Sequence, residues 1–562
     1  MAPPEATFQS IPETDTTSLT VPDRLTVQQV AKRRAASGQL VAGVAAVADV
    51  AAFKGRTQHL HKQHAKRWDH RLTDECKQRK GNSLKGAAKF LKTPGLISLG
   101  GGLPSSEYFP FEDVSFTVSP FGDGAHAQPV SVHAGKHDMA EGKSDFDIDT
   151  AFQYGQGHGA AQFLRWLIEH TEIIHDPPYQ DWSCTMSIGS TSATDFAFRM
   201  FCKPGDWVLT EEFTFPSMLE TARPMGLRVQ GVGMDEHGMR ADALDELLSN
   251  WDESVRKGPK PFVVYTVPTG QNPTGSTQTL ERRRAIYAVA QKHDLYILED
   301  EPYYFLQMPP YTPTSTTTSP PSAPASHDAF LRSLVPSFLS LDTDGRVMRM
   351  DSFSKVIAPG ARCGWITASE QICERYRTHS DVATQSPSGM SQLLLFKLLE
   401  DQWGHAGYLD WLLHIRIEYT RRRDAILRAC ETYLPRDIVR WTPPTAGMFH
   451  WMQVDFTRHP RWPELGLEAI EDEIFRTNVE HGTLLMKGSW FGASEKGWEG
   501  AGGGGGQAEE TGEKMFFRAT YAAAKFGQID EAIRRFGESV RECFGVVEAA
   551  NGRANGQANG TH

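Results

Sequence analysis

A lysine set among small hydroxyl residues is the first feature of this sequence with clear chemical potential. Lys355 ends the run that begins at Asp351 (sequence DSFSK), and Arg362 follows seven positions later, after a Pro-Gly turn. A lysine whose pKa is depressed is a nucleophile that forms an imine with an aldehyde. The planar guanidinium of an arginine on a nearby turn suits bidentate binding of a phosphate group. Read alone, the stretch also fits a solvated loop of serine and lysine.

A cluster of acids ends another apolar run. Glu299, Asp300 and Glu301 follow Leu295–Leu298, which has the composition of a buried strand. A buried carboxylate is unfavourable unless a partner neutralises it. One partner that would stabilise Asp300 is a protonated pyridine-type nitrogen, and a ring protonated in this way is an electron sink. The acid would then tune a bound ring rather than shuttle protons.

Two more loops carry groups that bind polar ligands. Gln271–Gly275 (sequence QNPTG) follows the apolar run Phe262–Val267, and its Asn272 amide can donate a hydrogen bond to a phenolate oxygen. Gly189–Ser192 opens a helical stretch. Its free backbone N–H groups and hydroxyls therefore predict an anion site that suits a phosphate.

The elements that must position these loops are short apolar runs alternating with helical stretches. Between the runs Phe262–Val267 and Leu295–Leu298, the segment 277–293 places its apolar residues on one helical face. Strands that alternate with helices imply a mostly parallel sheet with helices on both faces. Ligands of such sheets bind at the carboxyl ends of the strands, so we expect the four loops to meet there.

Composition and charge exclude several classes of protein. The 562 residues are 40% hydrophobic with a formal net charge of −11, which is typical of a globular protein and favours neither nucleic-acid nor membrane partners. No apolar run reaches the roughly 20 residues that span a bilayer. The seven cysteines are scattered and form no CxxC pair. We therefore expect no disulfide framework, no metal site and a reducing, cytoplasmic location.

The N-terminal 60 residues are rich in Ala, Thr, Pro and Ser, which predicts a poorly ordered extension. The basic run Lys32–Arg34 precedes an Ala-rich stretch, as in some targeting signals. Glu5, Glu13 and Asp15 argue against a transit peptide, because such peptides are poor in acids.

Seven stretches of the sequence resemble, in the same order, motifs of the pyridoxal-phosphate-dependent aminotransferases of fold type I, class I/II. The resemblance covers residues 70–545 and is closest to the fungal aromatic amino acid aminotransferases and the kynurenine/2-aminoadipate aminotransferases. Any one motif is weak, whereas seven in order are specific. They are Ser98–Phe111, Phe152–Gly159, Gly189–Asp195, Gln271–Gly275, Leu298–Tyr304, Asp351–Trp365 and Phe516–Tyr521.

The resemblance implies a role for each matching residue around the cofactor, pyridoxal 5′-phosphate. Lys355 would hold the cofactor covalently and would move the proton between the substrate Cα and the cofactor's C4′ carbon. Asp300 would pair with the ring nitrogen. The remaining cofactor contacts would be Asn272 and Tyr303 to the ring oxygen, Ser190, Thr191, Ser352 and Arg362 to the phosphate, Phe215 stacked on the ring, and Tyr154 reaching the phosphate of a neighbouring subunit.

The substrate site implied by the resemblance centres on Arg518, which would clamp the α-carboxylate with help from Asn272 and the backbone N–H near Gly102. Relatives often carry tyrosine where Phe215 stands, so a phenolic hydrogen bond is lost here. Without the resemblance, Arg518 would fit a strand-edge arginine in a surface ion pair, and the aromatic residues would fit a hydrophobic core.

The fold implied by the resemblance is α/β, with a large domain whose mostly parallel sheet lies between helices, and a smaller α+β domain built from the N- and C-terminal segments. Two insertions depart from compact relatives, at 125–149 and in the Pro/Ser/Thr-rich stretch. The expected parts are a poorly ordered extension (1–65), an N-terminal segment of the small domain with an insertion (66–150), the large cofactor-binding domain (151–400, with the Pro/Ser/Thr-rich insertion at 309–326), the small C-terminal domain (401–548, with a Gly-rich loop at 493–513) and a disordered tail (549–562).

The activity implied is transamination of an aromatic amino acid with 2-oxoglutarate by a homodimer with shared active sites. Kynurenine and 2-aminoadipate stay open as donors, because the side-chain pocket is not readable from one sequence. Two alternatives are a different reaction of the same cofactor, such as elimination or decarboxylation, and an aminotransferase-like transcription regulator. The N-terminal 60 residues lack the apolar periodicity of a three-helix DNA-binding domain, which disfavours the regulator.

Overall fold

The computed structural model describes residues 24–37, 40, 48, 50–55, 61–87, 90, 93, 95–97, 99–122, 128–313, 324–493 and 514–546. The centre of the Pro/Ser/Thr-rich insertion, nearly all of the expected Gly-rich loop and the expected tail lie outside the described residues. Among the described residues, no helix combines the length and the apolar character that crossing a bilayer requires.

The central sheet of the large domain has seven strands. Its strands are β3 (Trp182–Ser187), β4 (Trp207–Glu211), β5 (Arg228–Val232), β8 (Val263–Thr266), β9 (Tyr296–Asp300), β10 (Val347–Ser352) and β11 (Gly364–Ser369). Their order is β3-β11-β10-β9-β8-β4-β5. β11 runs antiparallel to both neighbours, whereas the other adjacent pairs are parallel. The mostly parallel sheet expected from the sequence is confirmed.

Side chains alternate across this sheet, and each face is covered by its own helices. Val264 and Ile297 belong to one cluster of buried residues with α10 (Ala241–Ser249) and α12 (Leu280–Lys292), whereas Tyr265, Tyr296 and Leu298 belong to another with α7 (Ala161–Ile174) and α8 (Ser190–Phe201). Burial on both faces explains why the strands read as nearly continuous apolar runs. The covering helices are α7 (Ala161–Ile174), α8 (Ser190–Phe201), α9 (Pro216–Ala222), α10 (Ala241–Ser249), α12 (Leu280–Lys292), α14 (Phe338–Leu341) and α15 (Glu370–Ser380).

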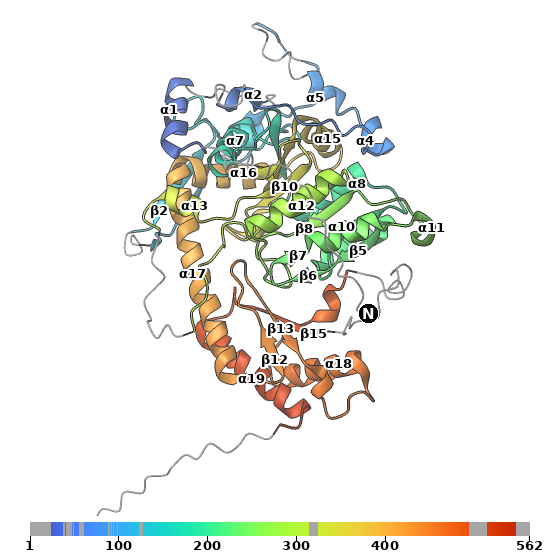
Figure 1. Ribbon diagram of the computed structural model, residues 1–562. Helices are drawn as coiled ribbons and strands as arrows, with labels where there is room; N and C mark the ends of the chain where they lie inside the picture. The colour runs from blue at the N-terminus through green and yellow to red at the C-terminus, as the bar shows by residue number, and fades with distance from the viewer. Residues whose placement is uncertain are drawn as a thin grey trace, which may run out of the picture.

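The small domain is an antiparallel sheet packed with helices. Figure 1 shows α17 (Gly404–Tyr433) running from the large domain to the small one. The sheet order is β12-β13-β15-β14. The other elements are β12 (Val439–Trp441), β13 (Phe449–Val454), β14 (Met486–Lys487), β15 (Met515–Thr520), α18 (Gly466–Glu480) and α19 (Phe526–Cys543).

The N-terminal part of the chain differs from the expectation in two places. Within the extension predicted to be poorly ordered, Val27–Ser37 forms helix α1, because Arg33 and Arg34 pair with Glu172 and Glu169 of α7. Residues expected in the small domain pack on the large one instead. Trp68 is fully buried and its indole N–H donates to Gly345 O at 2.8 Å, and α4 (Asp74–Gln78) packs on α8.

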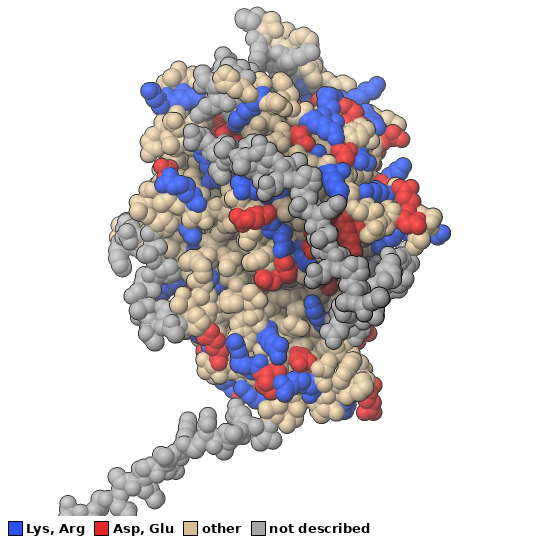
Figure 2. All heavy atoms as spheres, in the orientation of Figure 1, with Lys and Arg blue, Asp and Glu red and all other residues tan. Residues whose placement is uncertain are grey.

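The insertion predicted at 125–149 contributes β2 (Val130–Gly135), which pairs antiparallel with β1 (Asp113–Val118) from the segment before it. On the face of the molecule that Figure 2 shows, Lys and Arg are interspersed with Asp and Glu rather than gathered in one broad patch. Such mixed charge is typical of the surface of a globular protein.

Candidate active site

The loops that carry the predicted site residues meet at the carboxyl ends of neighbouring strands. Asp300 is the last residue of β9 and lies opposite Met350 in the register of β10, and Lys355 sits on the turn that follows β10. Asn272 lies in the loop after β8, and Ser190 begins α8 after β3. The parallel topology therefore brings together residues that are far apart in the sequence.

Asp300 is a buried carboxyl group with one oxygen satisfied and one free. Its Oδ2 accepts a hydrogen bond of 2.6 Å from the Tyr265 hydroxyl, whereas Oδ1 accepts none from the described residues. Burial raises the pKa of Asp300 to about 6, and the hydroxyl of Tyr265, followed by that of nearby Ser190, opposes that rise. A buried carboxylate oxygen without a donor calls for a cationic or N–H-bearing ligand.

Tyr265 is a functional candidate that the sequence analysis missed. It is buried on β8, and burial followed by the negative charge of Asp300 raises its pKa well above the ordinary value, so it stays a proton donor. A signal was present, because alternation along β8 and β9 turns Tyr265 toward the same sheet face as Asp300.

Lys355 has the depressed pKa that the predicted chemistry needs. Its side chain is half-buried, and burial together with the positive charge of Arg362 lowers its pKa. The turn that presents it is shaped by Ser352, whose Oγ accepts from the Ser354 backbone N–H at 3.1 Å and donates to Ser354 Oγ at 2.8 Å. An amine that loses its proton more readily is neutral for more of the time near neutral pH, and only the neutral amine can act as a nucleophile or a general base.

Arg362 lies beside the N-terminus of α8, where the sequence predicts a phosphate site. Its Nη2 donates to Ile188 O at 3.0 Å, and its Nη1 donates to Pro359 O at 3.0 Å. Gly189, the N-cap of α8, has a φ of 104°, and a Cβ added there would lie 2.6 Å from Arg362 Nη2. An exposed guanidinium against the free N–H groups of a helix terminus forms a cradle for an anion.

Arg518 reaches from the small domain into the large one. It lies on β15, and its Nη1 donates to Asn272 Oδ1 at 2.7 Å. The guanidinium stacks over the rings of Phe449 and Phe491 at 4.5 and 4.7 Å, and burial lowers its pKa. Arg518 forms no ion pair with any described residue, so it is not the surface ion-pair arginine that the motif alone also fits.

Tyr303 completes this side of the site. Its ring packs edge-on against Phe449 with centroids 5.8 Å apart, and burial followed by the charge of Asp300 raises its pKa. The aromatic rings beside Arg518 shield part of its guanidinium from water, which strengthens any bond to a carboxylate.

The structure of one chain does not bring every predicted residue to this cluster. Tyr154 has 60% of its surface exposed, and Gly102 is exposed as well. Neither is hydrogen-bonded to Lys355, Asp300 or Arg518. Phe215 is half-buried at the N-cap of α9, and Thr191 is exposed at the first turn of α8, so their contacts with the cofactor stay predictions.

The chemistry of these groups fits pyridoxal 5′-phosphate. Asp300 offers a free buried oxygen for the ring nitrogen, Lys355 offers an amine with a lowered pKa, and Arg362 with the α8 terminus offers a phosphate cradle. No cluster of His, Cys, Asp or Glu among the described residues has the geometry of a metal site.

Comparisons with known proteins identify the family of the chain. The chain matches the family model for aminotransferase class I and II over residues 123–536. An aromatic amino acid aminotransferase of Schizosaccharomyces pombe is 42% identical, covering 84% of this chain and 98% of the relative. An L-tyrosine:2-oxoglutarate aminotransferase of Serpula lacrymans is 36% identical, covering 75% and 83%. The solved structure of the aminotransferase Aro8 from Candida albicans has a TM-score of 0.78 at 41% identity, covering 86% of this chain and 100% of that one.

The family resemblance of the sequence motifs is thereby confirmed. The chain belongs to the aminotransferase class I and II family and is a transaminase that uses pyridoxal 5′-phosphate.

Proposed function

We propose that the enzyme transfers the amino group of an aromatic amino acid to 2-oxoglutarate, giving an aromatic 2-oxo acid and glutamate. The observation that carries the proposal is that two groups lie near Tyr303: Asp300, whose buried Oδ1 has no donor among the described residues, and Arg518, which lies over the rings of Phe449 and Phe491. The printed activities of the relatives support an aromatic donor and 2-oxoglutarate as the acceptor.

When bound, pyridoxal 5′-phosphate supplies an electron sink for the negative charge that develops at the substrate Cα. Asp300 would keep the ring nitrogen protonated through its free Oδ1, with Oδ2 fixed by Tyr265. Arg362 and the N-terminus of α8 would hold the phosphate, together with Ser190, Thr191 and Ser352.

The remaining residues act on the substrate. Arg518 would bind the α-carboxylate and fix the direction of the Cα–H bond, while Asn272 would share its amide between Arg518 and the ring oxygen that Tyr303 also contacts. Lys355, once displaced from the cofactor, would take the Cα proton, because its lowered pKa leaves more of the amine neutral. Phe449 and Phe491 offer apolar area that favours an aromatic side chain.

A homodimer with shared active sites is part of the same proposal. The segment before the hairpin exposes Ile97 and Leu99, with 88% and 94% of their surface accessible, and Tyr108 is exposed nearby. Apolar side chains exposed together favour burial against another protein surface. A second copy would also supply Tyr154 and the Gly102 segment to the site.

The seven cysteines are free and buried, which supports a reducing, cytoplasmic location.

The experiment that tests the function is a panel of amino acid donors with 2-oxoglutarate, scored by the glutamate formed. Phenylalanine, tyrosine, tryptophan, kynurenine and 2-aminoadipate are the donors to compare. Turnover with at least one aromatic donor is expected, and inactivity with all of them would overturn the proposed substrate class.

Light scattering of the holoenzyme tests the dimer, whose mass is expected to be twice the 62.5 kDa of the chain.

A further inference from the structure

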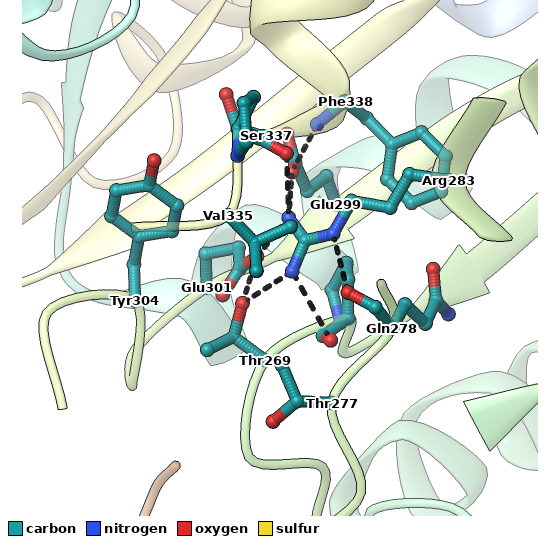
Figure 3. Close-up of polar contacts among 12 residues, drawn as sticks. Thr269, Thr277, Gln278, Arg283, Glu299, Glu301, Tyr304, Val335, Ser337 and Phe338 are labelled. Carbon is teal, nitrogen blue, oxygen red and sulfur yellow. Dashed lines mark hydrogen bonds and ion pairs between the residues drawn. The ribbon is translucent and has the colours of Figure 1, made fainter. Parts of the chain in front are cut away.

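The two acids that flank Asp300, Glu299 on β9 and Glu301 directly after it, lie on the other side of the sheet. Because side chains alternate along a strand, Glu299 and Glu301 face away from Asp300 and toward α12. Both are buried, and they meet the guanidinium groups of Arg283 on α12 and Arg349 on β10. Figure 3 shows the guanidinium of Arg283 near the carboxylates of Glu299 and Glu301.

Arg283 binds both stems of the loop that carries Asn272. Its Nη2 donates to Pro268 O at 3.2 Å and to Thr269 Oγ1 at 2.7 Å, and its Nε donates to Gln278 O at 3.3 Å (Figure 3). The neck of the loop is closed by a backbone bond from Gln278 N to Pro268 O at 2.9 Å. One buried side chain therefore fixes where the loop 268–278 leaves the sheet and where it returns.

Glu301 ties this loop to the strand that ends in Asp300. Its Oε1 accepts from Thr269 Oγ1 at 2.8 Å and from Arg283 Nη1 at 3.3 Å. Since Glu301 follows Asp300 directly in the chain, these bonds set the loop relative to the carboxyl end of β9. The position of Asn272 relative to Asp300 depends on this connection.

The opposite side of the loop packs against the small domain without spare room. A Cβ added to Gly270 would lie 2.6 Å from Gly447 Cα, and the Asn272 amide oxygen accepts from Arg518. The loop is thus held between Arg283 on one side and the small domain on the other, so a shift at its stems moves Asn272.

We propose that Arg283, acting with Glu301, is a positioning residue for the cofactor and substrate site. It lies behind the sheet and acts through the loop 268–278, which it holds so that Asn272 reaches the ring oxygen and Arg518 together. Only a guanidinium has the several directed donors that these carbonyl, hydroxyl and carboxylate partners need at once. The inference rests on the proposed roles of Asn272 and Asp300.

The test compares three variants of the holoenzyme. Arg283→Lys keeps the charge and loses the directed donors, and Thr269→Val removes the hydroxyl that joins Arg283 to Glu301. Arg346→Lys is the control, because Arg346 is also a buried arginine but binds Ala290 O, Leu295 O and the Asp344 carboxylate at the other end of the strands. The measurements are Tm, kcat and KM for both substrates, and the midpoint pH of the visible absorption of the bound cofactor.

We expect Arg283→Lys and Thr269→Val to lower kcat/KM by about tenfold or more and to shift the absorption midpoint, since small displacements of positioning groups have effects of this size. Arg346→Lys should lower Tm, change kcat/KM by less than about twofold and leave the midpoint pH of the absorption unchanged. If Arg283→Lys behaves like the control, Arg283 is merely structural and the inference fails. Should that variant not fold, Thr269→Val decides alone.

A double-mutant cycle checks whether Arg283 shifts the absorption midpoint through the side-chain amide of Asn272. In the background of Asn272→Ala, Arg283→Lys is expected to cause no further shift of the absorption midpoint, because the group that it positions is gone. Additive shifts would overturn the inference. The activity of the wild-type enzyme separates the proposed function from the positioning role of Arg283. Inactivity with amino acid donors would refute the proposed function, whereas the double-mutant cycle, read by cofactor absorption, would still test whether Arg283 positions Asn272.

Discussion

At the scale of single residues, the hydroxyl of Tyr265 decides which oxygen of Asp300 is available. Loss of a hydrogen bond to a buried carboxylate destabilises its charged form by about 1.5–3 kcal/mol, which corresponds to roughly 1–2 pH units. Tyr265→Phe should therefore raise the pKa of Asp300 above about 6 and move the acid limb of the kcat/KM profile to higher pH. A pH–rate series on both enzymes measures the shift.

The control for this prediction is Tyr296→Phe. Tyr296 is also buried in the sheet, but its hydroxyl has no hydrogen-bond partner among the described residues, so its removal should leave the pH profile in place. Equal profiles for Tyr265→Phe and wild type would show that Tyr265 does not tune Asp300.

Arg518 carries the second prediction at this scale. Arg518→Ala should weaken binding of both amino and oxo acid substrates by about 1.5–3 kcal/mol, the scale of a lost hydrogen bond to a charged group. Arg518→Lys keeps the charge but not the bidentate fork, so an intermediate KM is expected. Steady-state kinetics with each substrate measures the effect, and near-normal KM values in the alanine variant would remove Arg518 from the site.

Lys355 gives a prediction of a different kind. Lys355→Ala should abolish turnover while the protein still binds pyridoxal 5′-phosphate, because the phosphate and ring contacts come from other residues. Borohydride reduction followed by mass spectrometry should then find cofactor attached to the wild-type chain at Lys355 and to no site in the variant. Retained turnover would refute the assignment.

At the scale of elements, the N-terminus of α8 and the turn that carries Arg362 form one phosphate cradle. Gly189→Ala should push Arg362 away, because the new Cβ would lie 2.6 Å from its Nη2. We expect the dissociation constant of pyridoxal 5′-phosphate to rise by about tenfold, the effect of roughly 1.4 kcal/mol. Titration of the apoprotein with cofactor measures the change.

A matched substitution separates this effect from backbone strain. Gly205 has a φ of 92°, similar to the 104° of Gly189, and a Cβ there would meet nothing within 4 Å. Gly205→Ala should therefore lower Tm and leave cofactor affinity unchanged. An equal loss of affinity in both variants would mean that strain, and not the displaced arginine, weakens binding.

At the scale of the whole molecule, helix α1 connects the N-terminal extension to the core. Burial disfavours the ionised form of Glu169, yet hydrogen bonds from His405 and Arg34 hold its pKa at about 2. The stability that this group contributes is present above the ordinary pKa of a glutamate and is lost as pH falls from about 4.3 toward 2. Arg34 lies close to Glu400 as well, so one arginine joins α1, α7 and the helical turn before α17.

Arg34→Met leaves Glu169 buried without its cationic partner. We expect this variant to lose about 3 kcal/mol at neutral pH, the scale of a broken buried ion pair, and to show a lower Tm by calorimetry. Arg67→Met is the control, since the pair of Arg67 with Asp69 is largely exposed and should matter little. If both variants melt at the wild-type temperature, α1 does not stabilise the fold.

The sequence alone was sufficient for the parts of this protein that local chemistry defines. The order of apolar runs predicts the parallel strands, and the residues just after them, Asn272, Asp300 and Lys355, lie at the carboxyl ends of β8, β9 and β10 as expected. This works because the topology of alternating strands and helices places strand ends together whatever the helices contain.

Only the tertiary structure decided which groups face each other across long stretches of chain. Tyr265 precedes Asp300 by 35 positions, Arg283 reaches both stems of its loop from a helix, and Arg34 meets Glu169 over 135 positions. In the sequence each is an ordinary aromatic or basic residue. Their roles come from burial, because a polar group enclosed in the core must find a partner there, and the partner is fixed by packing rather than by neighbouring residues.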